Sequence, residues 1–345
     1  MTLIQLSEAH VIGAIISYLL GVFIVPFVIY YSAKKGLIDK PNARKIHTGN
    51  ISRLGGIAIW ASTMLTFLSL IFLSYYPYGS LLSGILLGSS LMFLLGLVDD
   101  LFGLNARFKL LIQIIIASIV YLLGIQINTL YNPFGDQIQL GWLSYFVTIF
   151  WIVAISNAVN FIDGVDGLAG SIITISSVGL GIISISNLSG SAISALIAFI
   201  LAGSMLAFLT YNFHPAKIFM GDSGALFSGF LLATLSITGT MKTATMVMIV
   251  PIFLLAVPII DITFSSLRRI SKGQSPFVAD AEHIHHKLLH AGFSQNKTVL
   301  ILAGIALVMG ALGAYLISAS LIKYFLYAVG ISLFMLVLSL FAKIK

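Results

Sequence analysis

Apolar segments long enough to cross a lipid bilayer recur along almost the whole chain, and they constrain its fold more than any other feature. Hydrophobic residues occupy 59% of the 345 positions and charged residues only 8%. A helix needs about 20 consecutive, mainly apolar residues to cross the hydrocarbon core of a bilayer. Soluble domains of this length carry far more charge, so the sequence predicts an all-α, polytopic membrane protein.

Windows of this length predict about eleven transmembrane helices within a single integral-membrane domain, residues 1–345. Their expected ranges are 10–31, 55–75, 79–98, 108–125, 143–160, 168–186, 191–212, 224–240, 243–264, 298–318 and 322–342. Between the fourth and fifth, polar and apolar residues alternate across residues 126–142. This alternation around a Pro-Phe-Gly-Asp sequence predicts a short β-hairpin on the membrane surface.

The basic residues predict the orientation of the chain. The expected loops on one side of the membrane are long and polar, at residues 32–54, 99–107, 161–167, 213–223 and 265–297. Of the 18 lysines and arginines, only Lys242 and Lys323 fall on the other side, where the turns are short. Basic residues concentrate on cytoplasmic loops, so we expect the N-terminus outside and the C-terminus inside. The net charge of +7 therefore reflects topology, and no nucleic-acid partner is expected.

The segment NAVNFIDGVDGLAG, residues 157–170, carries the densest side-chain chemistry of the chain. Asn157, Asn160, Asp163 and Asp166 recur every third residue at the end of an apolar helix. Polar groups at such a position are costly unless they bind something. The glycines between them let a ligand approach the backbone closely. A plain Gly/Asp turn between two spans is the alternative, although it needs neither asparagine.

Two more acidic groups are expected at the same membrane face. Asp99 and Asp100 end the third span, and Asp222 precedes the eighth in the sequence FMGDSG. Oxygen ligands suit Mg²⁺, which proteins usually hold with one or two carboxylates and the phosphates of a substrate. Three acidic clusters therefore predict a magnesium site for phosphoryl transfer. Taken alone, Asp99 and Asp100 are equally consistent with an interfacial helix cap.

Basic and imidazole side chains are expected beside these acids. Lys109 begins the fourth span, Lys45 lies in the first loop, and the sequence HIHH contributes His283, His285 and His286. Lys109 can meet a phosphate or simply anchor a helix at the membrane surface. The first loop can be a topology signal only. The histidines can hold a pyrophosphate, bind a metal or be solvated. The chain has no cysteine, which excludes disulfides and thiolate zinc sites.

Together these motifs resemble a known superfamily over nearly the whole chain. DD at residues 99–100, NAVNFIDGVDGLAG, FMGDSG and HIHH occur in the order found in polyprenyl-phosphate N-acetylhexosamine-1-phosphate transferases. This superfamily, glycosyltransferase family 4, includes WecA, TagO and MraY. HIHH and the first loop, PNARKIHTGNISRLGG, are similar to the WecA/TagO branch, which favours UDP-GlcNAc as donor. Ser52-Arg53 departs from the Pro-Arg common in that loop, which puts the shape of the loop in doubt.

The resemblance implies roles for individual residues. Asn160 and Asp222 match positions that hold Mg²⁺, for which Mn²⁺ can substitute, against the pyrophosphate of the donor. Asp166 matches the residue that reads the uracil edge, and Phe219 matches the ring on which uracil stacks. Asp99 and Asp100 match an acidic pair that serves either to deprotonate the lipid phosphate or to support the metal, and Lys109 matches a lysine that contacts phosphate. His283, His285 and His286 match a histidine motif near the pyrophosphate and sugar, and Lys45 is a weaker match.

The resemblance further implies a reaction and a location. GlcNAc-1-phosphate would pass from UDP-GlcNAc to undecaprenyl phosphate, releasing UMP, on the cytoplasmic face of a bacterial inner membrane. Such a product begins an envelope polysaccharide, and similarity to MraY suggests a homodimer. Another UDP-N-acetylhexosamine, or UDP-MurNAc-pentapeptide, remains an alternative donor. A cation-coupled transporter is a second alternative, but transporter sites lie near the bilayer midplane, whereas these acids gather at one interface.

The ninth expected span carries features of its own. Pro251 and Pro258 are expected to kink it and to open a groove for the lipid chain. Asp261 lies near its cytoplasmic end. We expect this carboxylate to pair locally, with Arg268 or with a loop backbone.

Overall fold

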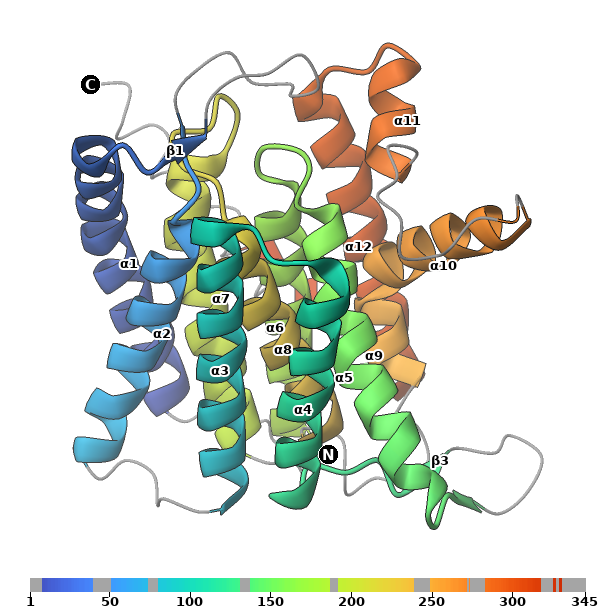
Figure 1. The fold of residues 1–345 in the computed structure, drawn as a ribbon. Helices are drawn as coiled ribbons and strands as arrows, with labels where there is room; N and C mark the ends of the chain where they lie inside the picture. Colours follow the sequence, from blue (N-terminus) through green and yellow to red (C-terminus); the bar gives the residue numbers. More distant parts are fainter. Residues whose placement is uncertain are drawn as a thin grey trace.

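The computed structural model describes residues 8–39, 51–73, 80–130, 137–186, 192–238, 249–271, 273, 283–317, 325–326 and 329–330. Most of these residues belong to long α-helices that stand side by side in one bundle (Figure 1). The long helices are α1 (Glu8–Lys35), α2 (Gly55–Phe72), α3 (Ser80–Phe102), α4 (Ala106–Leu122), α5 (Leu143–Ile162), α6 (Leu168–Ser186), α7 (Ala192–Asn212), α8 (Gly221–Thr238) and α12 (Gln295–Ile317). The prediction of a mainly helical protein is confirmed.

Helix α8 lies at the centre of the bundle. Every residue from Ser223 to Thr238 is buried, because α2, α3, α5, α6 and α7 all pack against this helix. In contrast, α1 turns large apolar side chains such as Phe23 and Phe27 outward. Apolar side chains on the outer face are what a helix in contact with lipid presents. The first turn of α8 is therefore held on several sides, and this turn carries Asp222.

Seven helices of the described chain are long and apolar enough to cross a membrane: α1, α2, α3, α5, α6, α7 and α12. They coincide with seven of the expected spans, so the chain is a multi-pass membrane protein. Helices α4 and α8 form where the fourth and eighth spans were expected. The last expected span lies almost entirely outside the described residues. The total of eleven spans and the direction of the chain stay predictions.

The ninth expected span is not one continuous helix. It consists of α9 (Ile249–Leu254) and α10 (Ala256–Ser271), separated at Leu255, and α10 projects from the side of the bundle (Figure 1). Pro258 has no N–H, and its ring displaces the carbonyl four residues earlier, that of Leu254. The Ser176 hydroxyl of α6 donates a 2.8 Å hydrogen bond to this carbonyl. The expected kink is present, and a side chain of another helix satisfies the carbonyl that the proline frees.

Replacing Ser176 with alanine should therefore destabilise the protein. The Leu254 carbonyl would lose its buried donor, at a cost of about 1–2 kcal/mol. The neighbouring Ser177 is a matched control, because its hydroxyl is buried without a hydrogen-bond partner. Thermal unfolding in detergent should show a lower midpoint for Ser176→Ala and an equal or higher midpoint for Ser177→Ala. Equal midpoints for the two variants would contradict this role of Ser176.

Two small antiparallel strand pairs lie at opposite ends of the bundle (Figure 1). β3 (Thr129–Leu130) pairs with β4 (Ile138–Gln139), where the surface hairpin was expected. β1 (Ile38–Asp39) pairs with β2 (Ile51–Ser52) at the other end, where the short helix α11 (Ile284–His290) also lies, on the opposite side of the bundle. The connections after α3, α5 and α7 lie at this second end too. The described parts of the long polar loops thus gather at one end, as the sequence predicted.

Candidate active site

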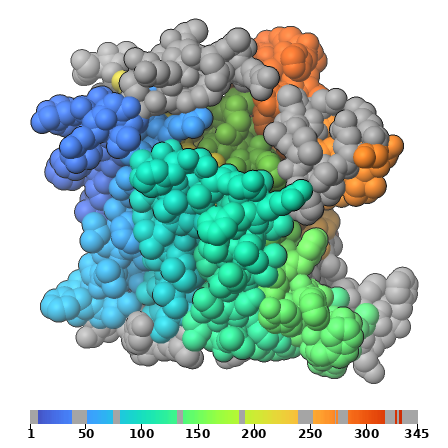
Figure 2. All heavy atoms as spheres, in the orientation of Figure 1, coloured from blue at the N-terminus to red at the C-terminus, as the bar shows by residue number. Residues whose placement is uncertain are grey.

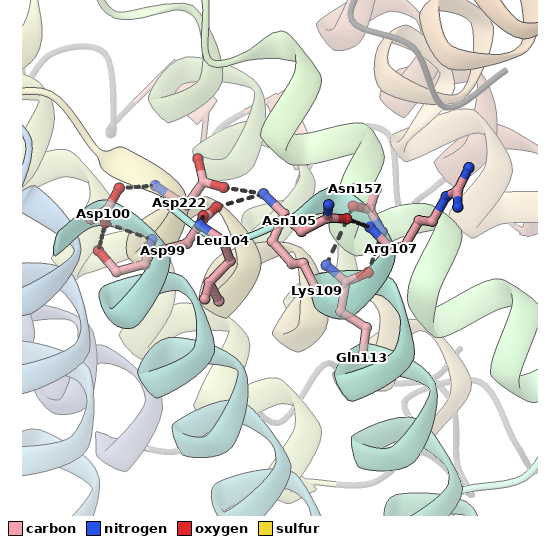
Figure 3. Close-up of polar contacts among 10 residues, drawn as sticks. Asp99, Asp100, Leu104, Asn105, Arg107, Lys109, Gln113, Asn157 and Asp222 are labelled. Atoms are coloured by element: carbon pink, nitrogen blue, oxygen red, sulfur yellow. Dashed lines mark hydrogen bonds and ion pairs between the residues drawn. The ribbon is translucent and has the colours of Figure 1, made fainter. Parts of the chain in front are cut away.

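The acidic pair of α3 faces the first turns of α4 and α8 at the polar end of the bundle (Figure 3). α3 continues through Asp99 and Asp100 and ends at Phe102, and Asn105 starts α4 by accepting a 2.9 Å hydrogen bond from Arg107 N–H. This short connection folds α4 back beside α3. In Figure 2 the surface recedes between the upper ends of α3 and α4 and the segment that contains α11, and atoms from the middle of the chain line the recess.

Lys109 joins two of the three acidic clusters. Its ammonium group lies 2.7 Å from an Asp99 carboxylate oxygen and also donates to Asp222 (Figure 3). The second Asp99 oxygen accepts a 2.6 Å hydrogen bond from Leu104 N–H. Asp222 keeps 29% of its side chain exposed and Lys109 keeps 20%, so solvent reaches both groups. One cation and two carboxylates thus stand where a small charged ligand has access.

Asp100 has a different environment from Asp99. One of its oxygens accepts a 2.8 Å bond from Asp222 N–H, and the other accepts bonds of 3.0 and 2.6 Å from Ser223 N–H and the Ser223 hydroxyl. The carboxylate therefore caps the N-terminus of α8 from a different helix, where N–H groups lack intrahelical partners and negative charge is favoured. Asp100 fixes the turn that presents Asp222.

The backbone before α8 is joined to the end of the first loop. Phe219 N–H donates to Ser52 O at 2.8 Å, and the N–H groups of Gly55 and Gly56 donate to the carbonyls of Phe219 and Met220. Gly221 has a φ of 70°, and a Cβ there would lie 2.2 Å from Arg53 O. Only glycine fits this position. At Ser52, where the resembling family commonly has proline, the carbonyl and the hydroxyl both accept backbone hydrogen bonds.

Asn157 is held by Gln113, a residue that the sequence did not single out. The Asn157 amide donates to Gln113 Oε1 at 2.6 Å and to Val153 O at 2.8 Å (Figure 3). Gln113 is completely buried on α4. The pair therefore connects α4 with α5, one turn before Asn160. In this structure Asn157 supports the site rather than lying open in it.

Asp163 stands among other carboxylates. α5 ends at Ile162, so Asp163 starts the loop instead of continuing the helix. Burial by the surrounding protein raises the pKa of the Asp163 carboxyl to about 7, and the negative charges of Asp222, Asp100 and Asp166 add to the effect. The structure thus brings the acidic segment to the same place as the DD pair and FMGDSG. Such crowding of negative charge favours a bound cation.

Asp166 and Phe219 lie on the side of the connection between α7 and α8. One Asp166 oxygen lies 2.8 Å from His214 Nδ1 and accepts a 3.1 Å bond from Ala216 N–H. Asn212 ties the same regions together, because it accepts from Gly167 N–H and donates to Ile218 O. Phe219, in the connection between α7 and α8, is half-buried. The sequence around Asn212 and His214 contains no motif that would predict a role for either residue in the site.

The histidines cover the loop that follows Asp163. The His283 ring stacks between Phe161 and His285, with centroid distances of 5.6 and 5.7 Å. His285 lies over Gly164, where a Cβ would come 2.5 Å from its Nε2, and this nitrogen is buried without a hydrogen-bond partner. The residues that the structure describes contain no group of three acidic or histidine side chains in metal-binding geometry. The rings of His283, His285 and His286 pack against one another, with centroids 5.7 Å apart for His283 and His285 and 4.3 Å apart for His285 and His286.

His285 predicts a pH dependence of stability. Burial, with a contribution from the charge of His286, lowers its pKa from 6.5 to about 4. Between these values the unfolded chain binds more protons than the folded protein, so the free energy of unfolding falls as the pH drops through this window. The loss from this group is at most about 3 kcal/mol. On going from pH 7 to pH 5, the thermal midpoint of His285→Asn should fall less, or rise more, than that of wild type, because the raised pKa of Asp163 acts in the opposite direction in both proteins. An unchanged difference would contradict the prediction.

The residues at this end fit a magnesium ion. The side-chain nitrogen of Asn160 is buried without a hydrogen-bond partner. Turning the amide about its last bond would place the oxygen there, which can ligate a cation. Asp222 supplies a carboxylate with solvent access. Proteins usually hold Mg²⁺ with one or two side chains, while the phosphates of a substrate and water complete the coordination. A site with two protein ligands and access for a substrate agrees with this pattern. Lys45, also expected here, lies outside the described residues.

Comparison with known proteins agrees with this arrangement. The model of glycosyl transferase family 4 matches residues 82–240, which contain both DD and FMGDSG. The probable undecaprenyl-phosphate N-acetylglucosaminyl 1-phosphate transferase of Bacillus subtilis strain 168 is 38% identical over 314 residues, covering 90% of this chain and 86% of that protein. The chain belongs to glycosyl transferase family 4.

Other members of the family align over similar lengths. The decaprenyl-phosphate N-acetylglucosaminephosphotransferase of Mycobacterium leprae is 32% identical, over 87% of this chain and 81% of its own. The undecaprenyl-phosphate alpha-N-acetylglucosaminyl 1-phosphate transferase of Escherichia coli K12 is 30% identical, over 86% of this chain and 82% of its own. All three relatives are named for phosphotransfer of N-acetylglucosamine to a polyprenyl phosphate.

Proposed function

We propose that this protein transfers GlcNAc-1-phosphate from UDP-GlcNAc to undecaprenyl phosphate, giving undecaprenyl-pyrophosphoryl-GlcNAc and UMP. The observation that carries the proposal is the contact of Lys109 with Asp99 and Asp222, at the same end of the bundle as the Asp163 loop and the histidines. The names and coverage of the family members support the donor and the acceptor.

The chemistry joins two anions, so the site must offset their repulsion and align them. An oxygen of the lipid phosphate attacks the β-phosphorus of UDP-GlcNAc, and the bond from this phosphorus to the oxygen bridging the two phosphates breaks, which releases UMP. Lys109 contributes positive charge beside the reacting phosphates. Asp99, whose carboxylate touches Lys109, is placed to keep the attacking monoester free of its proton.

Asp222 and Asn160 would hold Mg²⁺, which when bound would neutralise charge on the donor pyrophosphate and on the leaving UMP. Asp100 keeps Asp222 in place through α8. Asp166 and Phe219 would receive the uracil, the carboxylate at its hydrogen-bonding edge and the ring on its face. His283, His285 and His286 would lie beside the pyrophosphate and exclude water from it.

The membrane arrangement follows from the same proposal. The polar end of the bundle would face the bacterial cytoplasm, where soluble UDP-GlcNAc is present. The chain would form a single domain in the inner membrane and could act there as a monomer or as a homodimer. The polyprenyl chain would lie against α10, where the break at Leu255 turns this helix away from α9. Pro258→Leu should then raise the KM for polyprenyl phosphate several-fold. An unchanged KM and an unchanged turnover would remove α10 as the lipid site.

The proposal is tested with purified protein in detergent, Mg²⁺, undecaprenyl phosphate and a panel of UDP-sugars, while UMP and lipid-linked product are measured. Release with UDP-GlcNAc alone, and its loss with EDTA, are expected. Release with a different UDP-N-acetylhexosamine or with UDP-MurNAc-pentapeptide would keep the reaction and change the donor. A folded protein that releases UMP from no donor would contradict the proposal and favour a transporter.

A further inference from the structure

The buried carboxylate of Asp261 has no part in the site described so far. It lies on α10, outside the acidic clusters at Asp99, Asp163 and Asp222, and only 2% of it is exposed. A buried carboxylate is unfavourable unless it is paired and hydrogen-bonded. The partners of Asp261 therefore indicate why an acid is retained at this position.

Asp261 uses its two oxygens for two different contacts. Oδ2 lies 2.9 Å from Nδ1 of His283, and Oδ1 accepts a 2.8 Å hydrogen bond from Ile284 N–H. We expected Arg268 or a loop backbone as the partner; the backbone partner is instead the first residue of α11, and the imidazole was not expected. Ser265 lies one turn further along α10, and its hydroxyl is 3.4 Å from the same ring nitrogen. The carboxylate accordingly fixes both the ring of His283 and the start of α11.

The His283 ring is restrained on its faces as well as at its edge. Phe161 stacks against it with an angle of 21° between the ring planes, and His285 lies almost parallel to it, at 6°. Phe161 is two residues before Asp163, and His285 rests on Gly164. The imidazole that Asp261 holds is therefore packed directly against the loop that carries the acidic residues of the site.

We propose that Asp261 is a positioning residue that acts through His283. By accepting the Nδ1–H of this ring, it fixes one tautomer and leaves Nε2 as the ring nitrogen open to a ligand. Asp261 itself touches no substrate. The role of the aligned imidazole, contact with a phosphate oxygen of the donor, rests on the proposed function. The orientation of the ring does not.

Asparagine is an informative replacement because the two oxygens have distinct partners. With the amide oxygen kept on Ile284 N–H, the amide nitrogen faces His283 and donates to Nδ1. The proton of a neutral imidazole then moves to Nε2, as the wrong tautomer. Side-chain size and the tether to α11 are preserved, so Asp261→Asn separates alignment of the ring from packing.

The experiment combines kinetics with nitrogen-15 NMR of histidine-labelled, full-length protein in detergent. We expect Asp261→Asn to lower kcat with UDP-GlcNAc and undecaprenyl phosphate by roughly 10- to 100-fold, and to leave the KM for the lipid within about two-fold. In a His283→Gln background the same change should cause little further loss, since its effect passes through the ring. Glu8→Gln, which removes an exposed carboxylate on α1, should match wild type.

The NMR measurement decides the orientation without any activity. The His283 signal, identified by its absence in His283→Gln, should show protonated Nδ1 in wild type and protonated Nε2 in Asp261→Asn. Independent, multiplying losses in the double variant, or a wild-type ring without a proton on Nδ1, would overturn the proposal. If wild type releases no UMP from any donor, the proposed function fails instead, and the wild-type NMR signal still tests Asp261. The same signal decides if Asp261→Asn does not fold.

Discussion

The Asp222→Asn variant is expected to release UMP from UDP-GlcNAc roughly 10³-fold more slowly than wild type, the scale on which loss of a charge-stabilising group acts. The substitution removes the negative charge that Lys109 contacts and that would hold Mg²⁺. It keeps the size of the side chain, and Asp222 N–H still donates to Asp100. The fold should therefore persist while turnover is lost.

Glu8→Gln is the matched control for this result. Like Asp222→Asn, it replaces one carboxylate with an amide. Glu8, however, is exposed at the start of α1 and does not belong to the candidate site. Its turnover should equal that of wild type. Thermal midpoints of both variants should lie within a few degrees of the wild-type value. A fully active Asp222→Asn protein would remove this carboxylate from the mechanism and the proposed magnesium site with it.

The Asp100→Asn variant should lose both stability and activity. Asp100 accepts three hydrogen bonds at the start of α8, two of them from backbone N–H groups. The asparagine amide nitrogen, itself a donor, would take the place of an oxygen that now accepts a hydrogen bond from α8. Leaving a buried N–H unpaired should lower the free energy of unfolding by about 1–3 kcal/mol. Turnover should fall because the first turn of α8, with Asp222, relaxes.

Ser223→Ala separates the two effects of Asp100. It removes one of the three hydrogen bonds, that from the Ser223 hydroxyl, and leaves the carboxylate and both backbone donors. We expect a loss of about 1 kcal/mol with turnover retained. The decisive comparison is the midpoint of Asp100→Asn. A midpoint equal to that of wild type, together with lost turnover, would mean that Asp100 acts on the substrate and not as a cap.

The helices were largely predictable because crossing a bilayer leaves few alternatives. A segment in lipid must satisfy its own backbone, so length and apolarity alone locate α1, α2, α3, α5, α6, α7 and α12. The ninth span illustrates the limit of this reasoning. Pro258 predicted the kink. Nothing in the neighbouring sequence predicted that Ser176, more than eighty residues away, donates a hydrogen bond to the Leu254 carbonyl.

The candidate site was predictable in its residue types and not in its contacts. DD, the Asn/Asp segment, FMGDSG and HIHH are visible as costly polar groups beside apolar spans, and the structure brings them to one end. From the sequence we expected Asp99 and Asp100 to act together as one acidic pair. In the structure, Asp99 contacts Lys109, whereas Asp100 caps α8. Gln113, Asn212, His214 and Asp261 were not assigned to the site, since each gains its role only from a distant partner.

What the sequence by itself determined is the membrane class, most of the helices, the side on which polar groups collect and the family. These depend on local hydrophobicity and on short motifs. Only the tertiary structure decided three other features. These are the different roles of the aspartates, the hydrogen bonds between the first loop and the FMGDSG turn, and the contact of Asp261 with His283. Each of these is a hydrogen bond between segments far apart in the chain, and its partner exists only once the helices have packed.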